Sequence, residues 1–427
     1  MMRSLFVVLA LSLFAQDAAV RELLQKLEDD RVETREQAQK ELAALGEAAL
    51  PPLREVVESP NSSGELKLRA AATIREIELN VKAAKVYREP ARVSLKATDK
   101  PLREVLDDLS RQAGVAIDSS SVNDKAAVTI DATDVSLMEA MDLLCRGQAE
   151  RNWEAKDDGA IRLTRERHVG YPAAYSGPFR IRVQSMNADR NNDFKARTVS
   201  VTCLLLADWD KRLKPSKIVD LEVSKATDDQ GTLLEVTAVD AGNFFRGGPG
   251  VQIRVGGGFL QDGWESSRNF ALRGLQPTAT SVTLEGTARY TFPLDQREVK
   301  IEKPANSENK DLGDTIVRLT RSGTPENWTI SFHKPPSSST PGWGKTIGQR
   351  FDPDSFVVVD QDGAEFTATL RTVGRGRQFQ DVGDAGIWYQ GVVQRNTAKA
   401  IKEVKFRFVD QTLIKSAPFK FSALALP

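Results

Sequence analysis

The fold is decided by a pattern that the chain uses twice, as Val93-Ser-Leu-Lys-Ala-Thr-Asp-Lys-Pro-Leu-Arg-Glu-Val-Leu-Asp-Asp-Leu109 and as Val128-Thr-Ile-Asp-Ala-Thr-Asp-Val-Ser-Leu-Met-Glu-Ala-Met-Asp-Leu-Leu144. The copies match at eight of seventeen positions with a constant offset of 35. Each copy begins with alternating apolar residues, which are typical of a strand, and continues with apolar residues three and four apart, which are typical of a helix. An extended segment then returns, at residues 115–117 and 161–163. The pattern predicts a small α/β domain at residues 91–166, built from a duplicated βαβ unit.

Helix boundaries in this domain are marked by capping residues. Ser136 and Glu139 have the spacing of a capping box, and Pro101 stands where the first turn of the earlier helix is expected. Gly114 and Gly147 follow the last apolar residue of each helix, so we expect them to end the two helices.

The phrase Pro-Leu-Arg-Glu-Val-Leu-Asp-Asp-Leu-Ser-Arg-Gln-Ala-Gly-Val at residues 101–115 belongs to a pattern that resembles the short N-terminal domain of secretins and TonB-dependent transporters. The resemblance covers residues 91–166. It implies a periplasmic, non-catalytic module that docks other proteins or packs against neighbouring subunits. The chain departs from the family because it has no secretin core, so neither pore formation nor transport is implied.

Residues 16–88 are expected to be helical, since apolar residues recur at spacings of three and four. The stretch from Arg35 to Leu53 resembles a HEAT repeat, with an ordinary helical hairpin as the alternative. Such arrays usually need about three repeats to bury a core, so this segment has too few helices for a solenoid. The expected core positions are Leu23, Leu24, Leu27, Ala38, Leu42, Leu45, Leu50, Leu53, Val56, Val57, Leu66, Ala70, Ile74, Ile77 and Val81.

The N-terminus has the features of a secretory signal. A positive charge at residues 1–3 precedes an apolar run from Ser4 to Phe14, and Ala15 ends the run with a small residue. Spanning a bilayer takes about 20 apolar residues, and this run is shorter, so the sequence favours a cleaved signal peptide over a retained membrane anchor. We expect a signal peptide at residues 1–15, no integral membrane segment after cleavage, and an exported protein that is periplasmic or at the cell surface.

The rest of the chain is rich in Gly, Thr, Val and Phe, and it predicts two antiparallel β-sandwich domains at residues 177–303 and 312–427. The two ranges resemble each other. Each contains an Asp- and Gly-bearing turn, at residues 228–231 and 360–363, and we expect a linker at residues 306–310. The fold class is therefore multidomain α+β: HEAT-like helices, a small α/β domain, then two β-sandwiches.

Composition narrows the possible functions. Lys plus Arg and Asp plus Glu both number 59, so no global field attracts nucleic acid. Two His and two Cys in the chain exclude a disulfide scaffold and a zinc site made of Cys and His alone. We expect His168 and His333 to be exposed turn residues. Cys145 and Cys203 fall on apolar faces, which predicts core thiols.

Other patterns resemble sites but have simpler explanations. The acidic pairs 107–108, 157–158 and 228–229 are neighbours in sequence, whose side chains point apart on a helix or strand, so we interpret them as solvated turns or faces. The acidic clusters at residues 352–354 and 360–363 lack the ligand ladder of a calcium loop and favour hairpins. The Gly-rich stretches 247–250 and 256–258 lack a phosphate-loop ending, and residues 374–377 form only a small basic hairpin.

No pattern assembles catalytic, cofactor-binding or metal-binding residues. We therefore expect a non-enzymatic protein-interaction or scaffold protein of the cell envelope, with an envelope protein as partner and no cofactor. An alternative is a binder of glycans or cell wall that uses Trp343, Trp388 and Tyr389 on sandwich loops. A third hypothesis is a hydrolase with two carboxylates facing each other across a pocket at about 5 to 9 Å.

Overall fold

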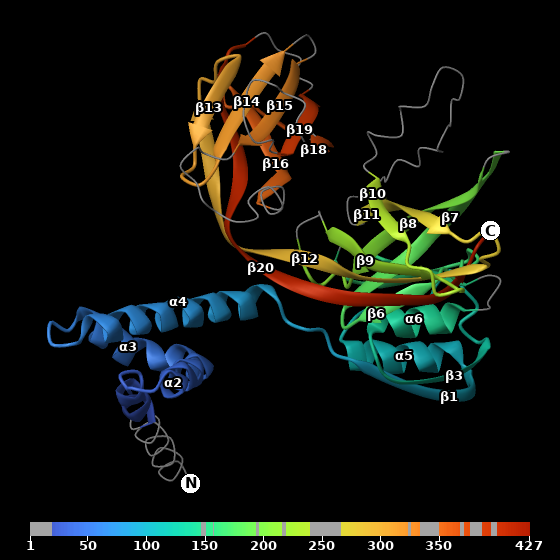
Figure 1. Cartoon of the computed structure of the whole chain (residues 1–427), viewed down its shortest axis with the longest axis horizontal. Helices are drawn as coiled ribbons and strands as arrows, with labels where there is room; N and C mark the ends of the chain where they lie inside the picture. The colour runs from blue at the N-terminus through green and yellow to red at the C-terminus, as the bar shows by residue number, and fades with distance from the viewer. Residues whose placement is uncertain are drawn as a thin grey trace. The chain divides into compact units, whose positions relative to one another are not determined.

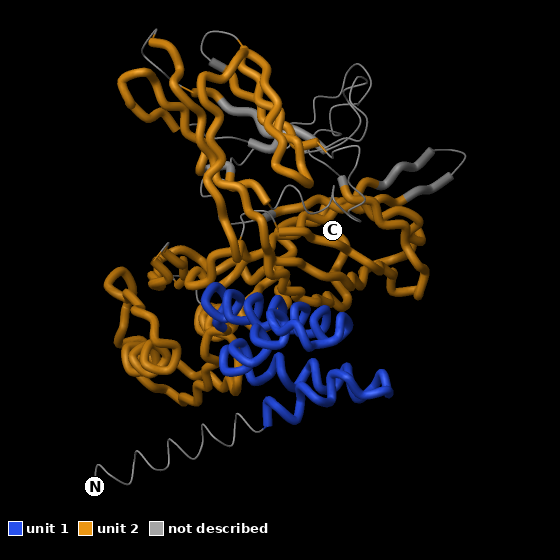
Figure 2. Tube along the Cα trace, turned by 90° about the vertical axis from the view of Figure 1, so that its left-hand side faces the viewer, with its two compact units in different colours: residues 1–88 blue, residues 89–427 orange. Residues whose placement is uncertain are grey.

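The computed structural model describes residues 19–146, 151–156, 158–193, 196–215, 219–239, 266–322, 326–333, 350–367, 371–375, 387–393 and 399–427. The chain divides into two compact units, Met1–Arg88 and Glu89–Pro427 (Figure 2). N-terminal helices are followed by several mostly antiparallel sheets, so the predicted multidomain α+β class is confirmed at this level. In the described part of the chain, no helix is both long and apolar enough to span a membrane.

The first unit is helical, as the apolar spacing predicts. Residues 19–26 form one helix, and the others are α2 (Val32–Leu45), the short 3₁₀ helix η1 (Gly46–Ala49), α3 (Leu50–Glu58) and α4 (Gly64–Val86). Gly46 ends α2 with a φ of 64°, and the Ser63 hydroxyl caps α4 by accepting from the Leu66 N–H. All of the predicted core positions lie in or against one apolar cluster, so the predicted core of the helical segment is confirmed.

The second unit opens with the α/β module, whose two copies pair with each other (Figure 1). The opening strands β1 and β3 form an antiparallel pair, whereas the return strands β2 and β5 are parallel neighbours in a sheet that β4 completes. Each copy runs strand, helix, strand, with β4 inserted before the return strand of the second copy. The return strand joins a different sheet from the strand that began, so the expectation of a duplicated βαβ unit is wrong in its strand pairing. The elements are β1 (Val93–Pro101), α5 (Leu102–Ala113), β2 (Ile117–Asp118), β3 (Ala127–Val135), α6 (Leu137–Cys145), β4 (Asn152–Ala155) and β5 (Ile161–Thr164).

The duplication is visible in the backbone. Asp99 and Asp134, which are 35 residues apart, both adopt left-handed φ values, 51° and 53°, near the end of the strand that precedes each helix. The Ser136 hydroxyl accepts from the Glu139 N–H, which confirms the predicted N-cap, and Gly114 ends α5 in the left-handed region. Pro101 is the residue before α5 rather than within its first turn.

The first β-sandwich places a five-stranded sheet against one half of a second sheet. Tyr290 joins them across the core, because its ring stacks on Phe179 at 4.0 Å and meets Trp209 edge-on at 5.9 Å. The first sheet has the order β10-β11-β8-β7-β6. Its strands are β6 (Ala173–Ser176), β7 (Phe179–Asp193), β8 (Ala196–Trp209), β10 (Glu235–Val239) and β11 (Ser266–Leu275).

The second sheet is shared by both sandwiches, because its two long strands, β12 and β20, run through both (Figure 1). Val299 and Ile301 at the end of β12 lie in the core of the second sandwich, whereas β20 starts there and ends beside the first half of β12. The sheet thus contains strands from both ranges, 177–303 and 312–427, that we expected to form separate sandwiches. Its order is β17-β16-β20-β12-β9, with β9 (Asp220–Asp228), β12 (Ser281–Glu302), β16 (Phe351–Asp360), β17 (Glu365–Thr367) and β20 (Ile401–Ala425).

The second sandwich closes with the sheet β13-β14-β15-β19-β18. The expected linker at residues 306–310 is wrong, since most of it is strand β13, which pairs with β14. Strand β15 of this sheet and strands β16 and β20 of the shared sheet bury large aromatic side chains in one core: Trp328, Phe332, Phe356, Phe406 and Phe408. The strands are β13 (Ser307–Asp311), β14 (Ile316–Ser322), β15 (Glu326–His333), β18 (Arg371–Arg375) and β19 (Ile387–Val393).

Candidate functional site

The densest group of buried charges in the described residues lies where the α/β module meets β7 and β8. Arg180 on β7 and Asp208 on β8 are register partners, so their side chains share one face of the sheet. The opposite face carries Phe179, Ile181 and Trp209 into the sandwich core. Asp208 is 5 % exposed and binds two guanidinium groups, Arg180 at 2.8 Å and Arg182 at 2.8 Å.

Helix α6 brings a second carboxylate to the same place. Asp142 is 7 % exposed, and both of its oxygens accept from Arg180 Nη1 at 2.9 Å. Trp153 Nε1 donates to Asp142 Oδ1 at 2.7 Å, and the Tyr175 hydroxyl donates to Asp142 Oδ2. The Arg180 guanidinium therefore lies between two carboxylates that come from different modules, and it also lies over the Trp153 ring at 4.9 Å. We call Asp142, Arg180, Arg182 and Asp208 the junction cluster.

Mutual pairing sets the ionisation of the junction cluster. Burial by itself would lower the pKa of Arg180, but the charges of Asp208 and Asp142 raise it well above its ordinary value. Burial would likewise raise the pKa of Asp208, but Arg180 and Arg182 hold it below its ordinary value. Desolvation and the charge of Asp142 both raise the pKa of the Tyr175 hydroxyl. These shifts keep Arg180 and Asp208 charged and Tyr175 neutral near pH 7, so none of the three is ready to exchange a proton.

His168 lies beside this cluster, and the expectation that it is an exposed turn residue is wrong. Its side chain is 12 % exposed, with Nε2 at 4.0 Å from Asp142 Oδ1 and Nδ1 at 3.0 Å from Asn152 Oδ1. Desolvation lowers the pKa of His168, Asp142 opposes this, and Arg180 adds to the lowering. The ring is therefore neutral at pH 7, and a contact between Nδ1–H and Asn152 Oδ1 leaves Nε2 as an acceptor.

Two hollows adjoin the segment that carries His168. One has a volume of 410 Å³ and is lined by Arg146, Tyr175, Lys420 and Leu424, among others; the other has 240 Å³ and is lined by Trp153, Glu166, Arg167 and Arg182, among others. Asp142, His168 and Tyr171 line both hollows, so we treat them as one groove. This groove combines guanidinium groups with aromatic rings, and it is the candidate functional site.

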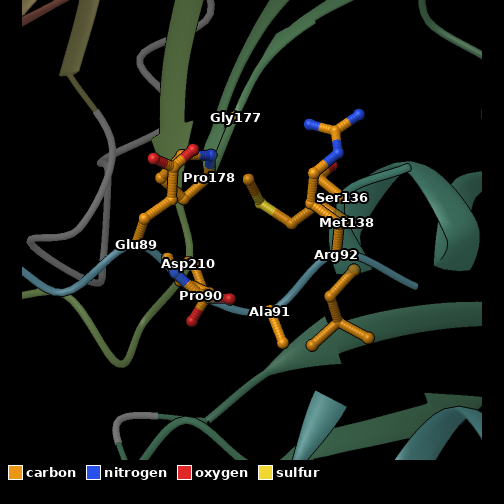
Figure 3. Close-up of a pocket in the computed structure, with 10 residues that line it drawn as sticks. Glu89, Pro90, Ala91, Arg92, Ser136, Met138, Gly177, Pro178 and Asp210 are labelled. Atoms are coloured by element: carbon orange, nitrogen blue, oxygen red, sulfur yellow. The ribbon is translucent and has the colours of Figure 1, made fainter. Parts of the chain in front are cut away.

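A further link ties the α/β module to the first β-sandwich. Arg212 is held by Asp210 at 2.6 Å and donates to the carbonyl of Ala113, at the C-terminal end of α5, where a cation is favoured by the helix dipole. Figure 3 shows the neighbouring gap, where Glu89, Met138 and Pro178 come together from three segments. Its volume is 10 Å³, so it has room for about one water molecule and is a packing gap rather than a ligand pocket.

The other residues singled out from the sequence do not meet at one site. His333, expected to be exposed, is half-buried at the end of β15, with Nε2 at 2.8 Å from the Ser331 hydroxyl, so that expectation is wrong. Burial lowers its pKa. Cys145 and Cys203 are buried and unpaired, which confirms core thiols, and desolvation raises the pKa of each to about 12.

The acidic patterns serve local structure. Asp107 pairs with Arg103 and Asp108 with Arg111, both on the surface of α5. Asp228 and Asp360 start two turns with the same hydrogen-bond pattern, in which each carboxylate accepts from the N–H groups two and four residues later. Each turn has a left-handed glycine at its fourth position. The predicted hairpin at residues 360–363 is confirmed, because β16 pairs with β17 across it, and residues 228–231 form the predicted turn. The hairpin expected at residues 352–354 is wrong, since these residues lie within β16. Asp228 and Asp360 are both buried. Desolvation would raise the pKa of Asp228, but the N–H donors hold it below its ordinary value.

Some predicted features lie outside the described residues: the signal peptide at residues 1–15, Gly147, Asp157, the Gly-rich stretches 247–250 and 256–258, and Trp343. The same holds for the side chains of Trp388 and Tyr389, for those of residues 353–354, and for the hairpin at residues 374–377. Within the described ranges, no group of three His, Cys, Asp or Glu side chains is placed to hold a metal ion.

The junction cluster was not predicted from the sequence. Arg180 and Arg182 alternate with Phe179, Ile181 and Val183, which is the pattern of a strand with one face in water. The available signal was Asp142, a charged residue within the apolar face of a short helix, because such a residue needs a buried partner.

No family model and no curated protein matches the chain. A solved structure of a conserved domain protein from Bacillus anthracis matches with 8% sequence identity and a TM-score of 0.17, covering 65% of this chain and 93% of that chain.

Proposed function

We propose that the chain is an exported, non-enzymatic interaction protein that acts as a scaffold in the cell envelope. The single observation that carries this proposal is the junction cluster. Its carboxylates, Asp142 and Asp208, do not face each other across an open pocket as a hydrolase requires, because the Arg180 guanidinium lies between them and binds both. The charges hold one module against the next.

Rigidity between the modules is what a scaffold needs. The hydrogen bonds of Arg180 are directional, and the Arg212 contact fixes a second point on the module, so sliding and rotation are both resisted. The strands β12 and β20 in turn join the two sandwiches, because they pair with each other from Ser281 to Glu302, with register shifts after Val282, Pro293 and Asp295. A partner that binds one part of residues 89–427 thereby meets the other parts in a fixed arrangement.

The test combines partner capture with an activity screen on the full chain. A photo-crosslinking amino acid is placed at the exposed Val169, and in a matched control variant at the buried Ile181, in the cell that makes the protein. We expect a reproducible envelope protein cross-linked from Val169 and none from Ile181. Hydrolysis of glycoside, ester or peptide substrates that is lost in Asp142→Asn or Asp208→Asn would overturn the proposal, as would the absence of any cross-linked partner from several exposed positions.

A further inference from the structure

We propose that the groove beside His168 binds an acidic, extended peptide segment of the partner protein. This inference rests on the proposed function and names the chemistry of the partner. The groove follows residues 166–172, which connect β5 to β6 without regular secondary structure, and the two hollows of 240 and 410 Å³ adjoin this segment.

The balance of charges in the groove favours an anion. Its lining contains five cations, Arg146, Arg167, Arg180, Arg182 and Lys420, but only two acids, Asp142 and Glu166. Arg180 and Arg182 are matched by Asp142 and Asp208, and Lys420 is matched by Glu285 at 2.8 Å. In the part of the chain that the structure describes, neither Arg146 nor Arg167 forms an ion pair, and Glu166 is the one remaining acid beside them. A guanidinium in such a position matches a carboxylate.

The rest of the lining favours a peptide over a small free anion. Val169 is 54 % exposed, and the Tyr171 ring, over which Arg182 lies at 5.8 Å, lines the groove next to it. Apolar surface of this kind suits a chain that alternates acidic and apolar side chains. The backbone N–H groups of His168 and Gly170 donate no hydrogen bond within the described residues, so they are available to an extended partner strand.

Arg146 and Arg167 are the residues to test, because neither belongs to the junction cluster and their replacement leaves that cluster intact. The probe is a fluorescent alternating Glu-Val octapeptide, and its fluorescence anisotropy is measured with the purified full chain. The control peptide has Gln in place of Glu. The control variant is Arg21→Gln with Arg75→Gln, which removes two exposed arginines of the helical unit.

We expect the Glu peptide to bind and the Gln peptide to bind far more weakly, with an affinity for the Glu peptide that falls as salt rises. Arg146→Gln and Arg167→Gln should each weaken binding by about fivefold, which is the effect of one charge contact near water. The control variant should bind like the wild type. Equal binding of both peptides, or unchanged binding in the double variant Arg146→Gln/Arg167→Gln, overturns the inference.

Two further outcomes separate the possible causes. If free citrate displaces the peptide as well as an unlabelled copy of the peptide does, the groove is a small-anion site and the inference is overturned. If the peptide does not bind but cross-linking from other exposed positions still recovers an envelope partner, the inference fails while the proposed function stands.

Discussion

Replacing Asp142 with Asn tests the junction cluster directly, because the duplicated module supplies its own control. Asp107 occupies the equivalent position in the first copy, 35 residues earlier, but it is 62 % exposed. Its one ion pair within the described residues is with Arg103, one helical turn away. The same chemical change is thus made at a buried site and at an exposed site of two related helices.

The expected magnitudes follow from the contacts. Removing one partner of a buried ion pair costs about 3 to 5 kcal/mol. Because Arg180 keeps Asp208 as a partner, we expect Asp142→Asn to fall at the low end of this range and to lower the free energy of unfolding by about 3 kcal/mol. An exposed pair four residues apart on a helix contributes about 0.3 to 0.5 kcal/mol, so Asp107→Asn should lower it by no more than that. Urea unfolding followed by tryptophan fluorescence measures both values, with Trp153 in contact with Asp142 as a reporter. Values for the two variants within about 0.5 kcal/mol of each other would refute the structural role of the cluster.

Three further outcomes are expected. Gly286→Ala should lower the free energy of unfolding by about 3 kcal/mol in thermal or urea unfolding, because a Cβ at Gly286 would lie 2.2 Å from the Glu222 carbonyl oxygen. Gly170→Ala is the control and should be neutral, since a Cβ there meets nothing within 4 Å. Equal stability of the two variants contradicts this prediction. Burial raises the thiol pKa of Cys145 and of Cys203 to about 12, so both thiols should resist a thiol reagent at pH 8 in the native protein and react with it after unfolding. Rapid reaction of either thiol in the native protein would show that it is accessible to solvent. Because the pKa of His168 in the folded protein lies below its ordinary 6.5, the unfolded chain binds a proton first, so the free energy of unfolding should fall as pH drops below about 6.5. His168→Gln should reduce this pH dependence, while the contribution of His333 remains. An unchanged pH dependence in His168→Gln excludes this role of His168.

The α/β module was readable from the sequence because its determinants are local. The strand-to-helix transitions follow from a change in apolar period, and Ser136 and Gly114 mark helix ends through contacts within a few residues. The helical unit was readable for the same reason, since its core is one face of each helix. None of these features depends on which distant segment packs against them.

The pairing of strands was not readable in the same way. The apolar alternation in β12 and β20 predicts strands but not partners, and only the register from Ser281↔Ala425 to Glu302↔Glu403 reveals that they bridge both sandwiches. Burial of charge has the same non-local character. Asp107 and Asp142 are identical in the repeat, and what separates them is that β7 places Arg180 beside Asp142 alone.

The chemistry of the junction bears on why charges are used there. A buried ion pair is often no more stabilising than an apolar contact of similar volume, because both ions lose their hydration. What the pair adds is direction: Arg180 binds both oxygens of Asp142 and also Asp208, an arrangement that admits one orientation of α6 on β7. Residues 166–172 and β6 follow directly from the module so oriented, and they line the groove together with the end of β20. Loss of the Asp142–Arg180 contact should therefore weaken peptide binding even though neither residue needs to touch the peptide. This outcome distinguishes a groove shaped by the junction from one formed by its loop alone.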